Sequence, residues 1–492
     1  MCFLSDPTKV QAYLKTIDEV IQKGPFKDDW ESLSHYGIPD WYARAKFGLF
    51  VHWGVYSVPA FHNEWYSREM YQKGSRTYAH HRKTYGRNFG YKDFIPQFKA
   101  EHYNPKEWAK LFAESGARYV TPVGEHHDGF KMYPSELCEW NAVNMGPKRD
   151  VYGELKKELT DRGIKYCSSS HRAEHYWFMN GGRNIPGCDV QDEKYREFYG
   201  PCVAKAKGDP SRRPEGSIVP SQAWLEDWLA STCELVDVNR PYTIYFDWWV
   251  RQHAFRPYMK KFLAYYYNRS REWGMEVCVF YKWDGVMYHC AVLDIERGQL
   301  AAINPRPWQN DTAIAKNSWG YTQGNDFKTP YELICNLIDV VSKNGCLMLN
   351  VGPKADGTIC PEEAAVLREI GKWLQINGEA IYDTSPYKIF GEGPSNCGGS
   401  FQEKFSFTKK DFRFTYKPGT LYVFALMPNQ KNIYRLKTLG SKDDELNYQI
   451  LGVSLLGRNC NVSFTQTNDY LELRAATDER FEMPVCFKIS ID

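Results

Sequence analysis

Ionisable side chains gather directly after the apolar segment 119–123. His126, His127 and Asp128 occupy three successive positions there. Two adjacent imidazoles beside a carboxylate can coordinate a metal ion, or they can exchange hydrogen bonds with a bound ligand. No H-E-x-x-H spacing surrounds this pair, and the sequence contains no C-x-x-C pair. Hydrogen bonding to a ligand is therefore the favoured interpretation, and metal binding stays the alternative.

Two acidic residues could supply acid–base chemistry. Asp247 directly follows the apolar segment 242–246 among aromatic side chains, and Glu296 comes 296 − 247 = 49 residues later. Cleavage of a glycosidic bond normally needs one ionised and one protonated carboxyl group. Simpler interpretations stay open, because a strand-terminal aspartate can cap the next turn and Glu296 can pair in solvent with Arg297.

A further polar residue, His52, follows the apolar segment 47–51. In a barrel of parallel strands, the side chains just beyond the strand ends meet at one face. We therefore predict one shared site behind these strands. Glu64 and Trp65 add an acceptor beside an aromatic ring, which suits the hydroxyls and the apolar face of a sugar, although they could also be an ordinary loop pair.

Strand and helix patterns alternate from residue 46 to residue 376, which predicts an α/β fold with a (β/α)8-like barrel. The predicted strands begin near 46 and cover 117–123, 164–168, 242–247, 275–281 and 346–351. The predicted helices cover 8–23, 104–115, 151–162, 221–236, 257–272, 330–343 and 361–376. Two long connections, 179–219 and 284–318, are predicted as loops, and the second of them carries Glu296.

The pattern changes near residue 385. Short stretches at 411–416, 421–426, 462–464 and 485–489 are typical of antiparallel strands, and together they predict a β-sandwich. We therefore expect two domains. Residues 1–385 would form the catalytic barrel with its N-terminal helix, and residues 386–492 would form the C-terminal β-sandwich.

Composition narrows the classes of partner. The chain has 492 residues, a formal net charge of +2 and no block of like charges, which argues against a nucleic-acid partner. No apolar run is long enough to span a membrane. Fourteen scattered cysteines indicate thiols in a reducing compartment rather than a disulfide framework. The first residues lack a signal-peptide pattern, so we expect a cytoplasmic protein, although a secreted protein whose leader was removed also fits.

Several motifs together are more specific than any one of them. They lie in the segments 41–54, 63–66, 126–130, 318–321, 344–353 and 377–382. In this order they resemble the α-L-fucosidases of glycoside hydrolase family 29. The resemblance spans residues 41 to 382 and extends more loosely to a C-terminal sandwich.

The resemblance implies hydrolysis of terminal α-L-fucose from oligosaccharides or glycoconjugates. It implies retention of configuration through a covalent intermediate, without a metal or organic cofactor. It assigns Asp247 as the nucleophile and Glu296 as the acid/base. It also implies contacts to the fucose from His52, Glu64, Trp65, His126, His127 and Trp319.

The sequence departs from the family pattern at three places. The family's Trp-Glu pair is Trp308-Gln309 here, which removes a rival to Glu296. A tyrosine-rich strand end is replaced by a segment with His171 and Glu174, which we expect to face the site. Lys282 stands where some members have an arginine. We expect His171 and Lys282 to bind substrate as well.

Three alternatives to an active α-L-fucosidase stay open at this point. The chain could be a fucose-binding homologue with weak catalysis, a glycosidase for a related sugar such as α-L-galactose, or a metal-dependent hydrolase that uses His126 and His127. A homo-oligomer is compatible with the sequence.

Overall fold

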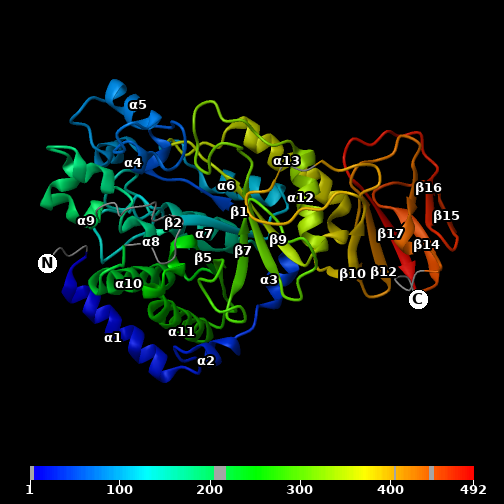
Figure 1. Cartoon of the computed structure of the whole chain (residues 1–492), viewed down its shortest axis with the longest axis horizontal. Coiled ribbons are helices and arrows are strands. Elements are labelled where there is room, and N and C mark those ends of the chain that lie inside the picture. The colour runs from blue at the N-terminus through cyan, green and yellow to red at the C-terminus, as the bar shows by residue number, and fades with distance from the viewer. Residues whose placement is uncertain (1–4, 204–217, 404–405, 443–447) are drawn as a thin grey trace.

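A closed barrel of parallel strands is followed by two antiparallel sheets (Figure 1). The computed structural model describes residues 5–203, 218–403, 406–442 and 448–492. The first barrel strand, β1 (Phe47–Val51), pairs with both β2 (Tyr119–Glu125) and the last strand, β9 (Gly345–Val351), which closes the barrel. The predicted fold class is confirmed.

The remaining barrel strands follow in sequence order between β2 and β9. They are β3 (Lys165–Tyr166) with β4 (Ser168–Ser170), which form one interrupted strand, then β5 (Thr243–Phe246), β6 (Cys278–Lys282), β7 (Val292–Glu296) and β8 (Trp308–Ala313). Every residue of β1, β5, β6 and β9 is buried. Parallel strands that are covered on both faces have continuous apolar sequences, and most of these strands could therefore be recognised in the sequence.

The predicted loop 284–318 is wrong, because it contains β7 and β8. These strands escaped detection because they direct polar side chains into the barrel. Asp294, Gln309 and Asp311 are all buried, and Gln309 Nε2 donates to Asp294 Oδ1 at 2.9 Å. Polar groups that satisfy each other can occupy a buried strand, but they remove its apolar pattern. Glu296 consequently ends a barrel strand instead of lying in a loop.

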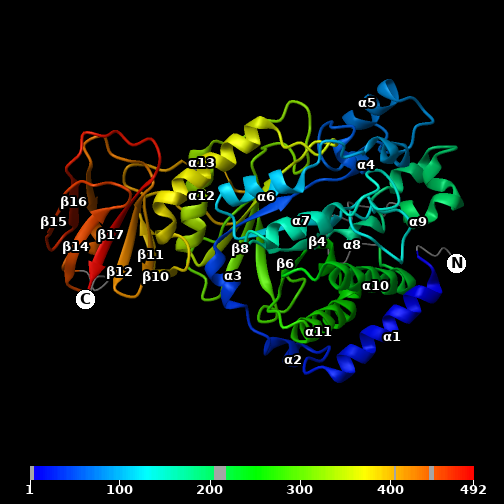
Figure 2. The same ribbon diagram turned by 180° about the vertical axis from the view of Figure 1, so that it is seen from behind.

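Helices cover the outside of the barrel (Figures 1 and 2). They are α6 (Pro105–Glu114), α7 (Val151–Thr160), α10 (Gln222–Asn239), α11 (Arg256–Glu272), α12 (Pro330–Ser342) and α13 (Pro361–Asn377). Side chains of Asn104, Ser221 and Thr329 cap three of them. The connections 283–291 and 297–307, both fully described, contain no helix.

Shorter helices and the N-terminal helix complete this part of the chain. They are α1 (Pro7–Lys23), which packs on α10 and α11, and α2 (Trp30–Ser34), α3 (Asp40–Ala45), α4 (Tyr66–Glu69), α5 (Arg76–Thr84), α8 (Arg172–His175) and α9 (Arg196–Tyr199). The predicted loop 179–219 contains α9 and several 3-10 turns, and its residues 204–217 lie outside the described ranges. Among the described helices, none is long and apolar enough to cross a membrane.

The C-terminal sheets pack on each other around an apolar core. One sheet has the order β10 (Ser385–Glu392), β11 (Phe412–Lys417), β12 (Thr420–Ala425), β17 (Val485–Ile491) and β14 (Ile450–Leu455), and the other has β13 (Ile433–Leu436), β16 (Leu471–Ala475) and β15 (Val462–Gln466). Phe414, Leu473 and Phe487 are fully buried between them. Alternating inward positions from two antiparallel sheets are typical of a sandwich.

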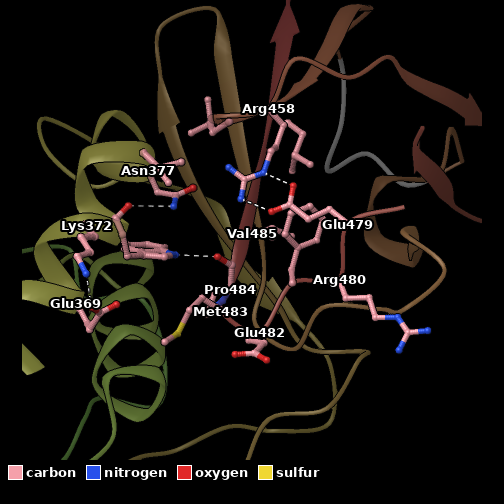
Figure 3. A pocket seen from close by; sticks show the side chains of 15 residues that line it. Glu369, Lys372, Asn377, Arg458, Glu479, Arg480, Glu482, Met483, Pro484 and Val485 are labelled. Carbon is pink, nitrogen blue, oxygen red and sulfur yellow. Dashed lines mark hydrogen bonds and ion pairs between the residues drawn. The ribbon is translucent and has the colours of Figure 1, made fainter. Parts of the chain in front are cut away.

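The barrel and the sandwich meet along α12 and α13. Asp339 of α12 forms a buried ion pair with Arg413 of β11, and the Trp373 indole of α13 donates to the Pro484 carbonyl at 2.8 Å. A groove of about 250 Å³ runs along this junction, with Lys372 on the helix side and Arg458 on the sandwich side (Figure 3). The barrel and the sandwich are therefore joined by specific polar contacts.

Candidate active site

Asp247 stands at the centre of the polar cluster beyond the strand ends. It follows β5 directly, and its Oδ1 accepts from the Trp248 backbone N–H at 2.8 Å. Its Oδ2 lies 3.3 Å from His171 Nδ1 and 3.4 Å from His127 Nε2. Burial favours the protonated form, but Lys282 and the two imidazoles outweigh it and hold the pKa of Asp247 well below its usual range. Asp247 is thus an ionised carboxylate.

Lys282 links three carboxyl groups. It ends β6, and its Nζ lies 3.3 Å from Asp247 Oδ1 and 3.8 Å from Asp311 Oδ2 and forms an ion pair with Glu296 Oε2. Burial alone would lower the pKa of this amine, but Asp311, Glu296 and Asp247 together raise it well above its usual value. The ammonium therefore stays charged and holds Asp247 and Glu296 on either side of one cation.

Glu296 is the other carboxyl group at this ammonium. Burial, together with the nearby charges of Asp311 and Asp247, outweighs Lys282 and raises the pKa of Glu296 to about 7. The two carboxyl groups beside Lys282 therefore differ, because Asp247 is ionised at neutral pH and Glu296 is poised to hold a proton. Such a division between acid and base is what pairs of catalytic carboxyl groups need.

A histidine is held between two carboxylates on the other side of Asp247. His127 Nδ1 lies 3.5 Å from Glu174 Oε2, and Glu174 is completely buried and accepts from the Trp249 backbone N–H at 2.9 Å. Burial disfavours a charged imidazole, but Asp247 and Glu174 raise the pKa of His127 to about 10. His127 is consequently a cationic donor that faces Asp247.

Two neutral histidines lie next to this cation. His52 Nδ1 contacts Asn350 Oδ1 at 2.7 Å, and the His52 and His126 rings are 5.5 Å apart. Burial first, and then the neighbouring histidines, lower the pKa of both side chains well below the usual range. His126 Nδ1 is buried and makes no hydrogen bond within the described residues.

Aromatic rings and a glutamate border the histidines. Glu64 Oε2 accepts from Ser318 Oγ and from the Trp319 backbone N–H, both at 2.9 Å. The Trp319 ring lies 5.2 Å from His52, and the Trp65 ring lies 5.6 Å from His127. The structure thus brings the ten predicted catalytic and substrate-binding residues into one continuous set of contacts.

The comparisons with known proteins agree with this arrangement. The family model described as "Alpha-L-fucosidase" matches residues 14–379.

The chain belongs to the α-L-fucosidase family.

Two relatives and one structure show how far the family likeness extends. The human tissue α-L-fucosidase is 33% identical over 380 residues, which cover 74% of this chain and 73% of that protein. The mouse tissue α-L-fucosidase is 31% identical over 459 residues, covering 90% and 88%. The crystal structure of Thermotoga maritima α-fucosidase in complex with fucose has a TM-score of 0.75 and 28% identity, and the match covers 94% of this chain and 100% of that one. The chain is therefore a glycoside hydrolase of this family.

This family member also contains two buried carboxyl groups that sequence reasoning missed. Asp311 accepts from the Tyr245 hydroxyl at 2.9 Å and lies beside Lys282. Burial and the charge of Asp311 raise the pKa of Asp294 well above its usual value. Both lie in the segment that was predicted as a loop. The alternation of Leu293 and Ile295 with acidic residues is a strand signal that could have revealed Asp294.

Metal coordination is the competing use of the histidines. Among the described residues, His126, His127 and His171 place one nitrogen each within 4.8 Å of one another, and His127, Glu174 and Asp247 form a second such group. Both groups need His127, whose nitrogens already face two carboxylates and whose pKa of about 10 means that an ion would first have to displace a proton. The contacts favour hydrogen bonding to a sugar.

Proposed function

We propose that the chain hydrolyses terminal α-L-fucose from oligosaccharides or glycoconjugates with retention of anomeric configuration. The family membership supports the sugar. The mechanism rests on one observation. Asp247 and Glu296 both contact the Lys282 ammonium, yet the pKa of Asp247 is lowered and the pKa of Glu296 is raised.

In the first step the Asp247 carboxylate attacks the anomeric carbon of the fucose. The bond from this carbon to the leaving oxygen breaks, and that oxygen takes the proton of Glu296. The products of this step are a fucosyl ester of Asp247 and the free leaving group. The low pKa of Asp247 and the raised pKa of Glu296 give each residue the protonation state that this step needs.

In the second step Glu296, now a carboxylate, takes a proton from water. The water oxygen attacks the anomeric carbon and releases Asp247, so that fucose leaves and both carboxyl groups regain their starting states. Two carboxyl groups that touch one ammonium are close together, which supports the separation of about 5–5.5 Å of retaining enzymes over the about 6.5–9.5 Å of inverting ones.

The remaining side chains would recognise the sugar. His127 is cationic and faces Asp247 and Glu174, whereas His52 and His126 are neutral and can each donate and accept. Glu64 supplies acceptor oxygens, and the rings of Trp65 and Trp319 offer apolar faces to the C–H groups and the methyl group of fucose. Lys282 would lie below the bond that is cleaved, between the two carboxyl groups.

The test is the anomer that forms first. Proton NMR during the hydrolysis of an aryl α-L-fucoside should show α-L-fucose before mutarotation produces the β anomer. Early β-L-fucose would contradict the retaining mechanism. No turnover would favour the alternative of a fucose-binding homologue, and faster turnover of the matching α-L-galactoside would favour a glycosidase for that sugar.

A further inference from the structure

An exposed apolar patch lies on the connection between β6 and β7. Trp283, Met287 and Tyr288 are 43%, 42% and 40% exposed. They are three of the ten large apolar side chains with such exposure in the part of the chain that the structure describes, and they lie within six residues. Clustered exposed aromatic side chains are typical of a binding surface rather than of ordinary solvent-facing residues.

The patch begins at the catalytic cluster. Trp283 directly follows Lys282, the cation shared by Asp247 and Glu296. Its ring centroid lies 6.5 Å from that of Trp248, the residue that follows Asp247. A ligand that extends from the cleaved bond over this rim would therefore meet Trp248 and then Trp283.

The backbone and one neighbour fix the position of the Trp283 ring. Trp283 has φ of 54°, a left-handed conformation that a bulky residue rarely adopts. Strained conformations of this kind persist where the surrounding structure holds them, and they cluster at ligand sites. The Arg251 guanidinium packs 4.5 Å from the ring centroid, so one face of the indole is supported while much of the side chain stays accessible.

Polar groups border the same patch. Asp284 lies 2.8 Å from Arg251 Nε and 3.5 Å from an Arg256 terminal nitrogen, and its side chain is 53% exposed. A groove of about 440 Å³ runs beside Trp283, Asp284 and Tyr288. An exposed indole next to charged hydrogen-bonding groups matches a pyranose ring, which has an apolar C–H face and a polar edge.

We propose that this patch is the subsite for the leaving group, in which Trp283 stacks on the pyranose ring to which the fucose is attached. This proposal rests on the proposed function and adds the side chain that holds the leaving-group sugar. Trp283 would act by positioning the leaving-group sugar next to Glu296. Sugar residues farther from the fucose would extend toward Tyr288.

The experiment compares two substrates that differ in the leaving group. An α-L-fucosyl disaccharide presents a pyranose ring to Trp283, whereas α-L-fucosyl fluoride releases a single atom that cannot reach it. Replacement Trp283→Ala should lower kcat/KM about tenfold for the fucosyl disaccharide and leave kcat/KM for the fluoride unchanged. Trp283→Phe, which keeps a ring at this position, should recover most of the loss. Phe464→Ala removes a similarly exposed aromatic ring from the sandwich and should change neither value.

Each other result has a definite meaning. Equal losses of kcat/KM on both substrates would mean that Trp283 supports the fold. No loss of kcat/KM on the fucosyl disaccharide would mean that Trp283 is not part of the subsite. Either result overturns the proposal. Sedimentation should give the same mass for the parent and Trp283→Ala, and a dimer that dissociates in the variant would assign the patch to a second copy of the chain. Failure of the parent to hydrolyse the fluoride would instead refute the proposed function itself, and the subsite with it.

Discussion

The carboxyl end of the barrel and the interior of the sandwich are filled in opposite ways. Behind the barrel strands, Lys282, Asp311 and Glu174 are charged or polar and almost completely buried. Between the sandwich sheets, Phe414 and Phe487 pack in a cluster of hydrophobic side chains. Burying charge is unfavourable unless every group is paired. The barrel end therefore depends on the pairing of its charged groups, whereas the sandwich core depends on apolar packing.

The sharpest test of this contrast is removal of the proposed nucleophile. Asp247→Ala should lower kcat/KM on an aryl α-L-fucoside by more than the roughly 10²–10⁴-fold that general acid–base groups contribute. Without the Asp247 carboxylate, Glu296 can still donate a proton, but no nucleophile attacks the anomeric carbon in the first step. The thermal midpoint, measured in parallel, should stay close to that of the parent. Activity within tenfold of the parent would exclude Asp247 as the nucleophile.

Replacement of the proposed acid should have the next largest effect. Glu296→Gln removes the proton donor and should cost roughly 10²–10⁴-fold in kcat/KM for a fucosyl disaccharide. In the parent, kcat/KM should fall as the pH rises through about 7, because Glu296 loses its proton there. The variant should lose this alkaline limb and should retain far more activity on α-L-fucosyl fluoride, which needs no acid. An unchanged alkaline limb in Glu296→Gln would assign the titration to another group.

Lys282→Met should shift the pH dependence of kcat/KM rather than abolish activity. The ammonium lowers the pKa of both Asp247 and Glu296, so its removal should raise both values. Asp247 must be ionised and Glu296 protonated, and therefore the acid limb and the alkaline limb should both move to higher pH. Lys282→Arg keeps the charge and serves as the control. Limbs that stay in place in Lys282→Met would show that the ion pairs do not tune the carboxyl groups.

Replacement of a core residue of the sandwich should lower stability and leave catalysis nearly unchanged. Phe487→Ala leaves a cavity in a fully buried position and should lower the free energy of unfolding by about 3–5 kcal/mol, with kcat/KM nearly unchanged at a temperature where the variant is folded. Phe464→Ala removes an exposed ring from β15 and should change the urea midpoint little. A large loss of kcat/KM in folded Phe487→Ala would show that the sandwich contributes to catalysis.

Sequence patterns anticipated the parts of the molecule whose burial is uniform. The apolar segments of β1, β5 and β9 revealed the barrel, and the residues just beyond them revealed His52 and Asp247. Polar strands were missed, because β7 and β8 are stabilised by pairs such as Gln309 with Asp294 that exist only in three dimensions. The triple contact of Lys282 and the pairing of Glu174 with His127 likewise depend on the registers of neighbouring strands and could not be read from one strand at a time.

The most direct test of the whole account is to trap the intermediate. A 2-deoxy-2-fluoro-α-L-fucosyl fluoride slows both steps, but its good leaving group lets the first step proceed. Intact-mass spectrometry should then show one added fluorofucosyl group, and peptide mapping should place it on Asp247. A label on another residue, or continued turnover with no covalent adduct, would contradict the central claim that Asp247 attacks while Glu296 donates the proton.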